Sequence, residues 1–210
     1  MKTDQNREEK KNILFITPFN IFPPFWGGGT RTFKLLKHIS DKYNVHLLSP
    51  SYKQFKGDKG EKYKEKLREE GVKIDLVGPE TSWIQYINPF ILLKALHKVI
   101  TKDIDLLICD YPWSGIYTLF LNKLLKIPYF LHEHNAEFEI ASQTRYEDPF
   151  LTKMLEKKAC ENAKKVFCVS ERDKRKIIDE LNIEEEKLEI LKNGVDPAVF
   201  HPENGNGEKI

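Results

Sequence analysis

The stretch Asn12-Ile-Leu-Phe-Ile-Thr17 decides the fold, because it is an uninterrupted apolar run with the length of one buried strand. A loop rich in proline and glycine follows at 18–29, and residues 30–39 then carry apolar side chains at helical spacing. A buried strand that leads through a loop into a helix is the unit from which parallel sheets are built. The first forty residues therefore predict an α/β protein.

The same alternation continues along the chain. Further buried strands are expected at 45–48, 72–77, 105–109, 128–132, 166–169 and 188–191. Helices are expected at 61–70, 89–100, 114–125, 151–163 and after the capping box Ser170-Glu-Arg-Asp173. This pattern predicts one α/β domain with a doubly wound parallel sheet. We expect residues 1–11 to form a disordered tail, 12–191 the domain and 192–210 a polar linker.

Composition excludes several classes of protein. The chain has 210 residues, with 34 Lys plus Arg against 32 Asp plus Glu, so it lacks the excess positive charge that nucleic-acid binding needs. Its three cysteines contain no C-x-x-C pair, which disfavours a disulfide scaffold and a structural zinc site. The N-terminus has no signal-peptide core, and the apolar window 106–125 is interrupted by charges and proline. We expect a cytoplasmic protein for which peripheral contact with a membrane stays open.

In doubly wound sheets, ligands bind beyond the carboxyl ends of the strands. The loop after the first strand ends in Gly27, Gly28 and Gly29, directly before the expected helix. Glycines there leave backbone N–H groups free for a phosphate or a sugar, which we favour over a merely flexible loop. A Cβ at Gly28 or Gly29 should then obstruct binding with little effect on stability.

Two common phosphate-binding motifs are absent from the sequence. Thr32 stands where the dinucleotide motif G-x-G-x-x-G requires glycine or alanine, and the second strand ends in Leu47-Leu-Ser-Pro50 without an acid for a ribose. The sequence contains no G-x-x-x-x-G-K-[ST] run. Neither a nicotinamide cofactor nor P-loop phosphoryl transfer is therefore expected.

The fifth expected strand runs into Leu131-His-Glu-His-Asn-Ala-Glu137, in which His132 and His134 alternate to one face. A metal site would use these two histidines and Glu137, but their spacing matches no known zinc motif. Two other interpretations stay open: a solvated loop, and a catalytic imidazole that orients or deprotonates a hydroxyl. The D-x-D sequence Asp103-Ile-Asp105 precedes its strand, so we interpret it as a polar turn.

Apolar side chains also gather outside the regular elements, in Ile21-Phe-Pro-Pro-Phe-Trp26 and in Trp83-Ile-Gln-Tyr-Ile-Asn-Pro-Phe90. Such clusters mark either a binding groove or membrane contact, or else they pack beneath loops. The sequence favours neither interpretation.

Four blocks, taken in order, resemble one known family. They are Pro23-Pro-x-x-Gly-Gly-Gly-Thr-Arg31, His134-Asn-x-Glu137, the pair Leu155-Glu-x-x-Ala159 and Ala163-x-x-Val-x-x-Val-Ser-Glu171, and Lys192-Asn-Gly-Val-Asp-x-x-x-Phe200. Together they resemble the family-4 (group 1) retaining glycosyltransferases. The resemblance implies a GT-B fold, in which two Rossmann-like domains face each other across a cleft. This chain would be the N-terminal, acceptor-side half, and its linker would lead to an absent C-terminal donor-binding domain.

The resemblance also implies roles for single residues. His134 would line the catalytic centre beside the transferred sugar. The implied substrate-binding residues are Gly28 and Gly29 at the donor phosphates or sugar, Arg31 near phosphate or acceptor, Asn135 and Glu137 in the acceptor pocket, and Ser170 and Arg172 at the neighbouring strand end.

The implied reaction is transfer of a sugar, with retention, from a nucleotide-diphosphate sugar to an unknown acceptor, either a sugar or a lipid-linked sugar. It needs no cofactor and no metal, because basic residues and backbone N–H groups stabilise the leaving diphosphate. Two alternatives are a stand-alone carbohydrate- or lipid-binding module and half of a nucleotide-sugar 2-epimerase. The 210 residues alone are expected to be inactive.

Overall fold

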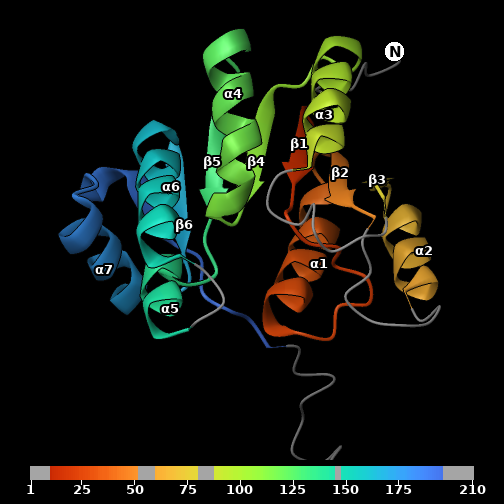
Figure 1. Ribbon diagram of the computed structural model, residues 1–210. Coiled ribbons are helices and arrows are strands. Elements are labelled where there is room, and N and C mark those ends of the chain that lie inside the picture. The colour runs from red at the N-terminus through yellow and green to blue at the C-terminus, as the bar shows by residue number, and fades with distance from the viewer. Residues whose placement is uncertain (1–9, 52–59, 80–87, 145–147, 196–210) are drawn as a thin grey trace, which may run out of the picture.

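The computed structural model describes residues 10–51, 60–79, 88–144 and 148–195. The strands are β1 (Asn12–Ile16), β2 (Asn44–Pro50), β3 (Lys73–Val77), β4 (Leu106–Asp110), β5 (Tyr129–His132), β6 (Lys165–Cys168) and β7 (Leu188–Ile190). The helices are α1 (Gly27–Ser40), α2 (Glu61–Glu69), α3 (Pro89–Thr101), α4 (Gly115–Leu125), α5 (Glu137–Gln143), α6 (Pro149–Asn162) and α7 (Glu171–Leu181). Figure 1 shows how these elements are arranged.

The described strands form one sheet in the order β3-β2-β1-β4-β5-β6-β7, and every pair is parallel. This order confirms the predicted Rossmann-like, doubly wound α/β fold. The chain leaves β1 toward β2 on one side and returns through α3 to β4 on the other. The strand order therefore reverses between β1 and β4, and the carboxyl ends of these two strands are where a ligand crevice is expected.

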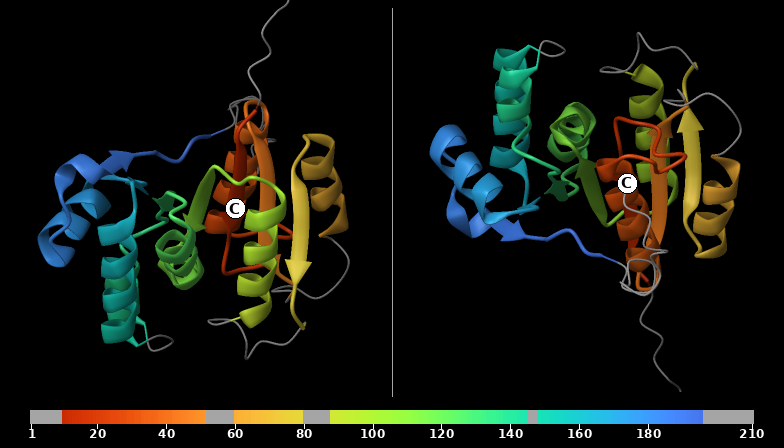
Figure 2. Two further views of the ribbon diagram at one scale, coloured as in Figure 1. Left: turned by 90° about the horizontal axis from the view of Figure 1, so that it is seen from above. Right: turned by 90° about the horizontal axis from the view of Figure 1, so that it is seen from below.

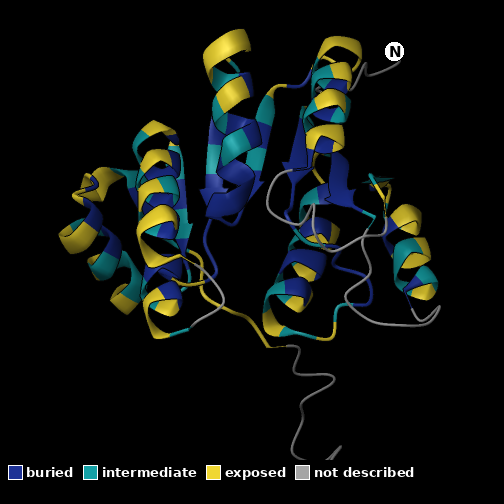
Figure 3. Ribbon diagram, viewed as in Figure 1, coloured by how far each residue is buried: buried dark blue, intermediate teal, exposed yellow. Residues whose placement is uncertain are grey.

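Alternation along β1 divides the hydrophobic core between the two faces of the sheet. Phe15 lies in one cluster with Leu36 of α1 and Leu67 of α2. Leu14 and Ile16 lie in the other cluster, which the helices α3, α4, α6 and α7 complete. Figure 2 shows the helices on both sides of the sheet, and Figure 3 shows that its central strands are buried. A strand buried on both faces explains why the first apolar run has no polar interruption.

Two elements differ from the expectation. The three glycines were predicted to end the loop before the first helix. Helix α1 instead begins at Gly27, so the glycines form its first turn. Helix α5 was not predicted, because its seven residues begin with a buried Glu137 and show no long apolar period. A distant side chain supplies the missing start signal: the carboxylate of Glu156 on α6 accepts the backbone N–H groups of Glu137 and Phe138, at 3.1 and 2.7 Å.

The D-x-D sequence forms the predicted polar turn at the amino-terminal edge of the sheet. Asp103 has a left-handed φ of 45°, and the carboxylate of Asp105 accepts the N–H of Asn12 at 2.7 Å. None of the described helices is long and apolar enough to cross a membrane.

The first apolar loop is divided: Ile21 and Phe22 are buried in the core, whereas Phe25 is 54% exposed. Most of the second apolar segment, 83–87, lies outside the described residues. The same holds for residues 1–9 of the expected tail and 196–210 of the expected linker, so those domain boundaries stay predictions.

A cluster of buried carboxyl groups, Glu133, Glu137 and Glu156, lies at the end of β5. Both side-chain oxygens of Glu133 are buried and have no hydrogen-bond partner among the described residues. Burial raises the pKa of Glu133 well above its ordinary value, and the nearby Glu156 and Glu137 raise it further. Burial also raises the pKa of Glu156 to about 8, against the two backbone N–H groups that it accepts. The fold therefore holds Glu133 as a neutral acid.

We expect Glu133→Gln to remove part of the loss of stability at high pH. The unfolded chain releases the Glu133 proton near its ordinary pKa of 4.5, while the folded chain keeps it. The free energy of unfolding of the parent should therefore fall as pH rises above that value, by at most about 1.4 kcal/mol per pH unit for one proton. Denaturant melts from pH 5 to 9 should show a smaller slope for Glu133→Gln and an unchanged slope for the exposed control Glu69→Gln. Parallel curves for the parent and Glu133→Gln would contradict the neutral assignment.

Candidate functional site

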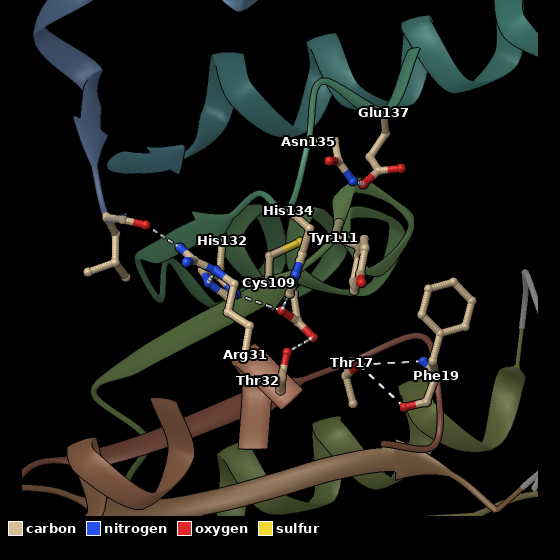
Figure 4. Close-up of polar contacts among 12 residues, drawn as sticks. Thr17, Phe19, Arg31, Thr32, Cys109, Tyr111, His132, His134, Asn135 and Glu137 are labelled. Atoms are coloured by element: carbon tan, nitrogen blue, oxygen red, sulfur yellow. Dashed lines mark hydrogen bonds and ion pairs between the residues drawn. The ribbon is translucent and has the colours of Figure 1, made fainter. Parts of the chain in front are cut away.

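Side chains from three elements meet at the carboxyl ends of β4 and β5. Asp110 ends β4, His132 ends β5, and His134 follows two residues later. Arg31 and Thr32 reach the same place from the first turns of α1. Figure 4 shows Arg31, Thr32, His132 and His134 gathered there.

The carboxylate of Asp110 is the centre of this cluster. Its Oδ1 accepts hydrogen bonds from Nδ1 of His132 at 2.7 Å and from Nε2 of His134 at 2.9 Å. Its Oδ2 accepts the hydroxyl of Thr32 at 3.0 Å. Burial alone would raise the pKa of Asp110, yet that pKa lies well below its ordinary value, because His134 and His132 stabilise the charged form. The site therefore contains a buried, ionised carboxylate.

An ionised carboxylate can only accept hydrogen bonds, so it determines which nitrogen of His134 carries the proton. Nε2 of His134 donates to Asp110, which leaves Nδ1 with its lone pair when the ring is neutral. Nδ1 has no hydrogen-bond partner among the described residues, and His134 is only 7% exposed. The ring is thus held in one orientation and offers one nitrogen to a ligand.

Tyr111 holds the other side of His134. The two rings are stacked, with centroids 3.9 Å apart and planes within 9°. Tyr111 has φ 60° and ψ 154°, which a non-glycine residue adopts only at a cost of roughly 1–3 kcal/mol. Its hydroxyl bonds to the side chain of Trp26, the residue that precedes α1. A strained backbone that places an aromatic ring against His134 is typical of a functional site.

The N-terminus of α1 lies against the same two rings. Trp26 gives this helix no side-chain cap, and its first turn has no acidic residue. The N–H groups of the first helical residues have no partner within a helix, and together with the helix dipole they favour an anion. A Cβ placed on Gly28 would overlap the hydroxyl of Tyr111 and lie 3.2 Å from Nδ1 of His134. The open nitrogen of His134 and an uncapped helix start are therefore neighbours.

The remaining predicted site residues form a second group, around the starts of α5 and α7. The exposed Asn135 donates to Glu137 at 3.2 Å, and Glu137 is buried. Ser170 caps α7 by accepting the N–H of Asp173 at 3.1 Å, and the buried Ala136 before α5 donates its N–H to the Asp173 carboxylate at 3.4 Å. Arg172 pairs with Glu139 at 2.8 Å at the surface.

The structure therefore brings Gly28, Arg31 and His134 together through Asp110 and Tyr111. Gly29 lies in the same helical turn but faces Trp26, whose ring a Cβ would meet at 2.7 Å. For the second group, no described hydrogen bond or ion pair connects Asn135, Ser170 or Arg172 to His134. Their binding roles stay predictions.

The residues that could hold a metal differ from those expected from the sequence. The third group near His132 and His134 is Asp110, not Glu137, and one ligand atom from each of the three lies within 4.8 Å of the others. Two histidines and a carboxylate can hold a transition metal. Here, however, both rings direct an N–H at the carboxylate, and the cationic Arg31 bonds to His132 at 2.8 Å. This arrangement satisfies the Asp110 carboxylate and both nitrogens of His132, and it places a positive charge beside the cluster, so we favour the hydrogen-bonded network.

Sequence reasoning missed Asp110 and Tyr111. The fourth strand was expected to end at Cys109, so Asp110 directly follows it and the rule of carboxyl ends could have pointed to this residue. No sequence signal points to Tyr111, because its role depends on a positive φ and on ring stacking.

The sequence predicted that a Cβ at Gly28 would have little effect on stability. The contact between Gly28 and Tyr111 changes that prediction. We expect Gly28→Ala to lower the free energy of unfolding by about 1–3 kcal/mol, because the new methyl group overlaps the Tyr111 hydroxyl. Tyr111→Phe removes that hydroxyl, so Gly28→Ala should cost less in a Tyr111→Phe background. Gly27→Ala is the matched control, since its Cβ has nothing within 4 Å. Urea melts measure all four variants, and equal costs for Gly27→Ala and Gly28→Ala would contradict this contact.

Solved structures share this fold. Sucrose-phosphate synthase from Thermosynechococcus elongatus superposes with a TM-score of 0.69 at 14% identity, over 92% of this chain and 50% of that one. HepE from Anabaena, solved in complex with UDP and glucose, gives 0.63 at 15% identity, over 90% and 46%. A glycosyltransferase from Rickettsia africae ESF-5 gives 0.57 at 20% identity, over 94% and 47%. The chain spans about half the length of these proteins.

No curated protein sequence matches this chain at a significant level. The family model described as Glycosyltransferase Family 4 matches residues 26–199, which is most of the chain and includes every predicted site residue. The structural neighbours are GT-B glycosyltransferases, and the extent of the overlap fits one of their two domains. The chain belongs to Glycosyltransferase Family 4.

Proposed function

We propose that this chain is the acceptor-side half of a retaining glycosyltransferase that uses a nucleoside-diphosphate sugar. The proposal rests on one observation: the uncapped start of α1 lies next to Nδ1 of His134. A helix start favours the negative charge of a diphosphate, and a fixed imidazole lone pair accepts a sugar hydroxyl. HepE, which shares the fold, was solved with UDP and glucose, and this supports a nucleotide sugar as donor.

In this proposal the cluster acts by positioning and by electrostatics. Asp110 keeps the Nε2–H tautomer of His134, and Tyr111 holds the plane of its ring. Nδ1 then orients one hydroxyl of the sugar beside the reacting carbon. The backbone N–H groups of Gly27, Gly28 and Gly29 stabilise charge that develops on the departing diphosphate. A second domain supplies the remaining contacts to the nucleotide, and no metal takes part.

We expect His134→Ala to lower kcat about a hundredfold or more in the protein that carries this chain together with its second domain, as for other positioned catalytic groups. His132→Ala should cost much less, because its nitrogens face Asp110 and Arg31 and neither is open to substrate. Transfer from a panel of nucleoside-diphosphate sugars measures both variants. Equal losses from the two substitutions, restored by added Zn²⁺, would favour the metal site instead. Saturable transfer by the 210 residues alone would contradict the need for a second domain.

We also propose that the surface formed by α3 and α4 makes peripheral contact with an anionic membrane. These two helices touch on one face of the sheet and contain neither Asp nor Glu. Their exposed apolar residues include Phe90, Leu93, Ile100, Phe120 and Leu124. Figure 3 shows exposed positions along both helices. Exposed apolar side chains without negative charge are the composition that binds lipid headgroups and acyl chains.

We expect Leu93→Ser with Phe120→Ser to reduce binding to vesicles of phosphatidylglycerol and phosphatidylcholine at least fivefold. Co-sedimentation measures the bound fraction, and pure phosphatidylcholine should bind the parent weakly. Phe150→Ser on α6, which removes an exposed apolar side chain elsewhere, is the control. Failure of the parent to bind the anionic vesicles would exclude this partner.

A further inference from the structure

Arg31 makes three hydrogen bonds in three directions. Its Nε donates to Nε2 of His132 at 2.8 Å, its Nη1 to Oδ1 of Asn193 at 2.6 Å, and its Nη2 to the carbonyl of Leu191 at 2.6 Å. Figure 4 shows the guanidinium between His132 and the segment that follows β7. One side chain of α1 thus joins the histidine cluster to the chain where it leaves the sheet.

The first of these bonds matches the tautomer of His132 that the ionised Asp110 already requires. A guanidinium has no acceptor, so Nε2 of His132 must accept, and Nδ1 must carry the proton that it donates to Asp110. Burial lowers the pKa of His132 to about 4, and the charge of Arg31 lowers it as well, although Asp110 opposes both. His132 is therefore neutral at pH 7 and always directs the same N–H at the carboxylate that His134 shares.

The other two bonds depend on the position of residues 191–193. Leu191 and Asn193 are exposed at the surface and lie 160 and 162 residues from Arg31 in the sequence. If this segment moves away, the guanidinium loses two of its three acceptors and keeps only its bond to His132 and its attraction to the Asp110 carboxylate among the described interactions. The bond from Arg31 to His132 and the seated segment therefore favour each other, and such a coupling is reciprocal.

We propose that Arg31 is a positioning residue, which couples the seating of residues 191–193 to the orientation of the His132–Asp110–His134 cluster. This inference rests on the proposed function for the role of His134, but the coupling itself is a property of this chain. It differs from the role implied by the resemblance, in which Arg31 lies near phosphate or acceptor. A phosphate on the two outer nitrogens would have to displace Leu191 and Asn193.

The test compares Arg31→Met and Asn193→Ala with Arg68→Met, which removes an arginine that pairs with Glu61 on α2. Long-range ¹H–¹⁵N spectra report the tautomer and the titration of His132 in this chain, and trypsin cleavage after Lys192 reports the seating of the segment. In Arg31→Met we expect a shifted Nε2 resonance of His132, because that nitrogen loses its donor, a titration moved to higher pH, and cleavage at least tenfold faster. Asn193→Ala should move both readouts in the same direction by less, and Arg68→Met should move neither.

An unchanged His132 spectrum in Arg31→Met, or in Asn193→Ala with faster cleavage, would overturn the coupling. If Arg31→Met does not fold, Arg31→Lys serves instead, because it keeps the charge but cannot reach all three acceptors, and it should give the faster cleavage and the shifted Nε2 resonance without the move of the titration. In the protein with its second domain, Arg31→Met should lower kcat and leave the donor KM unchanged. A raised donor KM with unchanged kcat would restore the phosphate-ligand role. Failure of the parent to transfer any sugar would leave the two readouts on this chain intact.

Discussion

The buried carboxylate of Asp110 is the constraint on which the site depends. A carboxylate removed from water is costly unless donors surround it, and this one receives a hydroxyl from α1 and N–H groups from two imidazoles. Because it is ionised, it assigns the proton of each ring. The same anion therefore connects α1, β4 and β5 and determines which nitrogen of His134 is left for a ligand. Removing any one donor would leave part of a buried charge unpaired.

The neighbouring features follow from this arrangement. Tyr111 directly follows Asp110, and its strained backbone turns the ring onto His134. Gly28 has no side chain because the Tyr111 hydroxyl occupies that space. The helix start that faces the rings is uncapped, in contrast to α7, which Ser170 caps. An enzyme that binds a diphosphate needs such open N–H groups, and they cost stability in the free protein.

Most of the fold could be predicted from the sequence, since each buried strand is a short apolar run and the intervening helices have a clear period. The positions of His134 after a strand and of Arg31 at a helix start could be predicted from the pattern, whereas their roles were implied only by the family resemblance and stay predictions. Their partners could not be predicted: the Glu156 cap of α5, the bond from Arg31 to Asn193 and the ring stack on Tyr111 each join residues that are distant in sequence or depend on backbone strain. Local patterns carry no information about such contacts.

The ionisation state of Asp110 tests the account most directly. A ¹³C-detected titration of its side-chain carboxyl group, followed from pH 8 to pH 3, reports that state without any substrate. The account predicts the chemical shift of a carboxylate at every pH where the chain stays folded, because both imidazoles stabilise the charge. A carboxyl group that takes up a proton near pH 4 or above while the fold persists would contradict it, and the assigned tautomers of both histidines would fall with it.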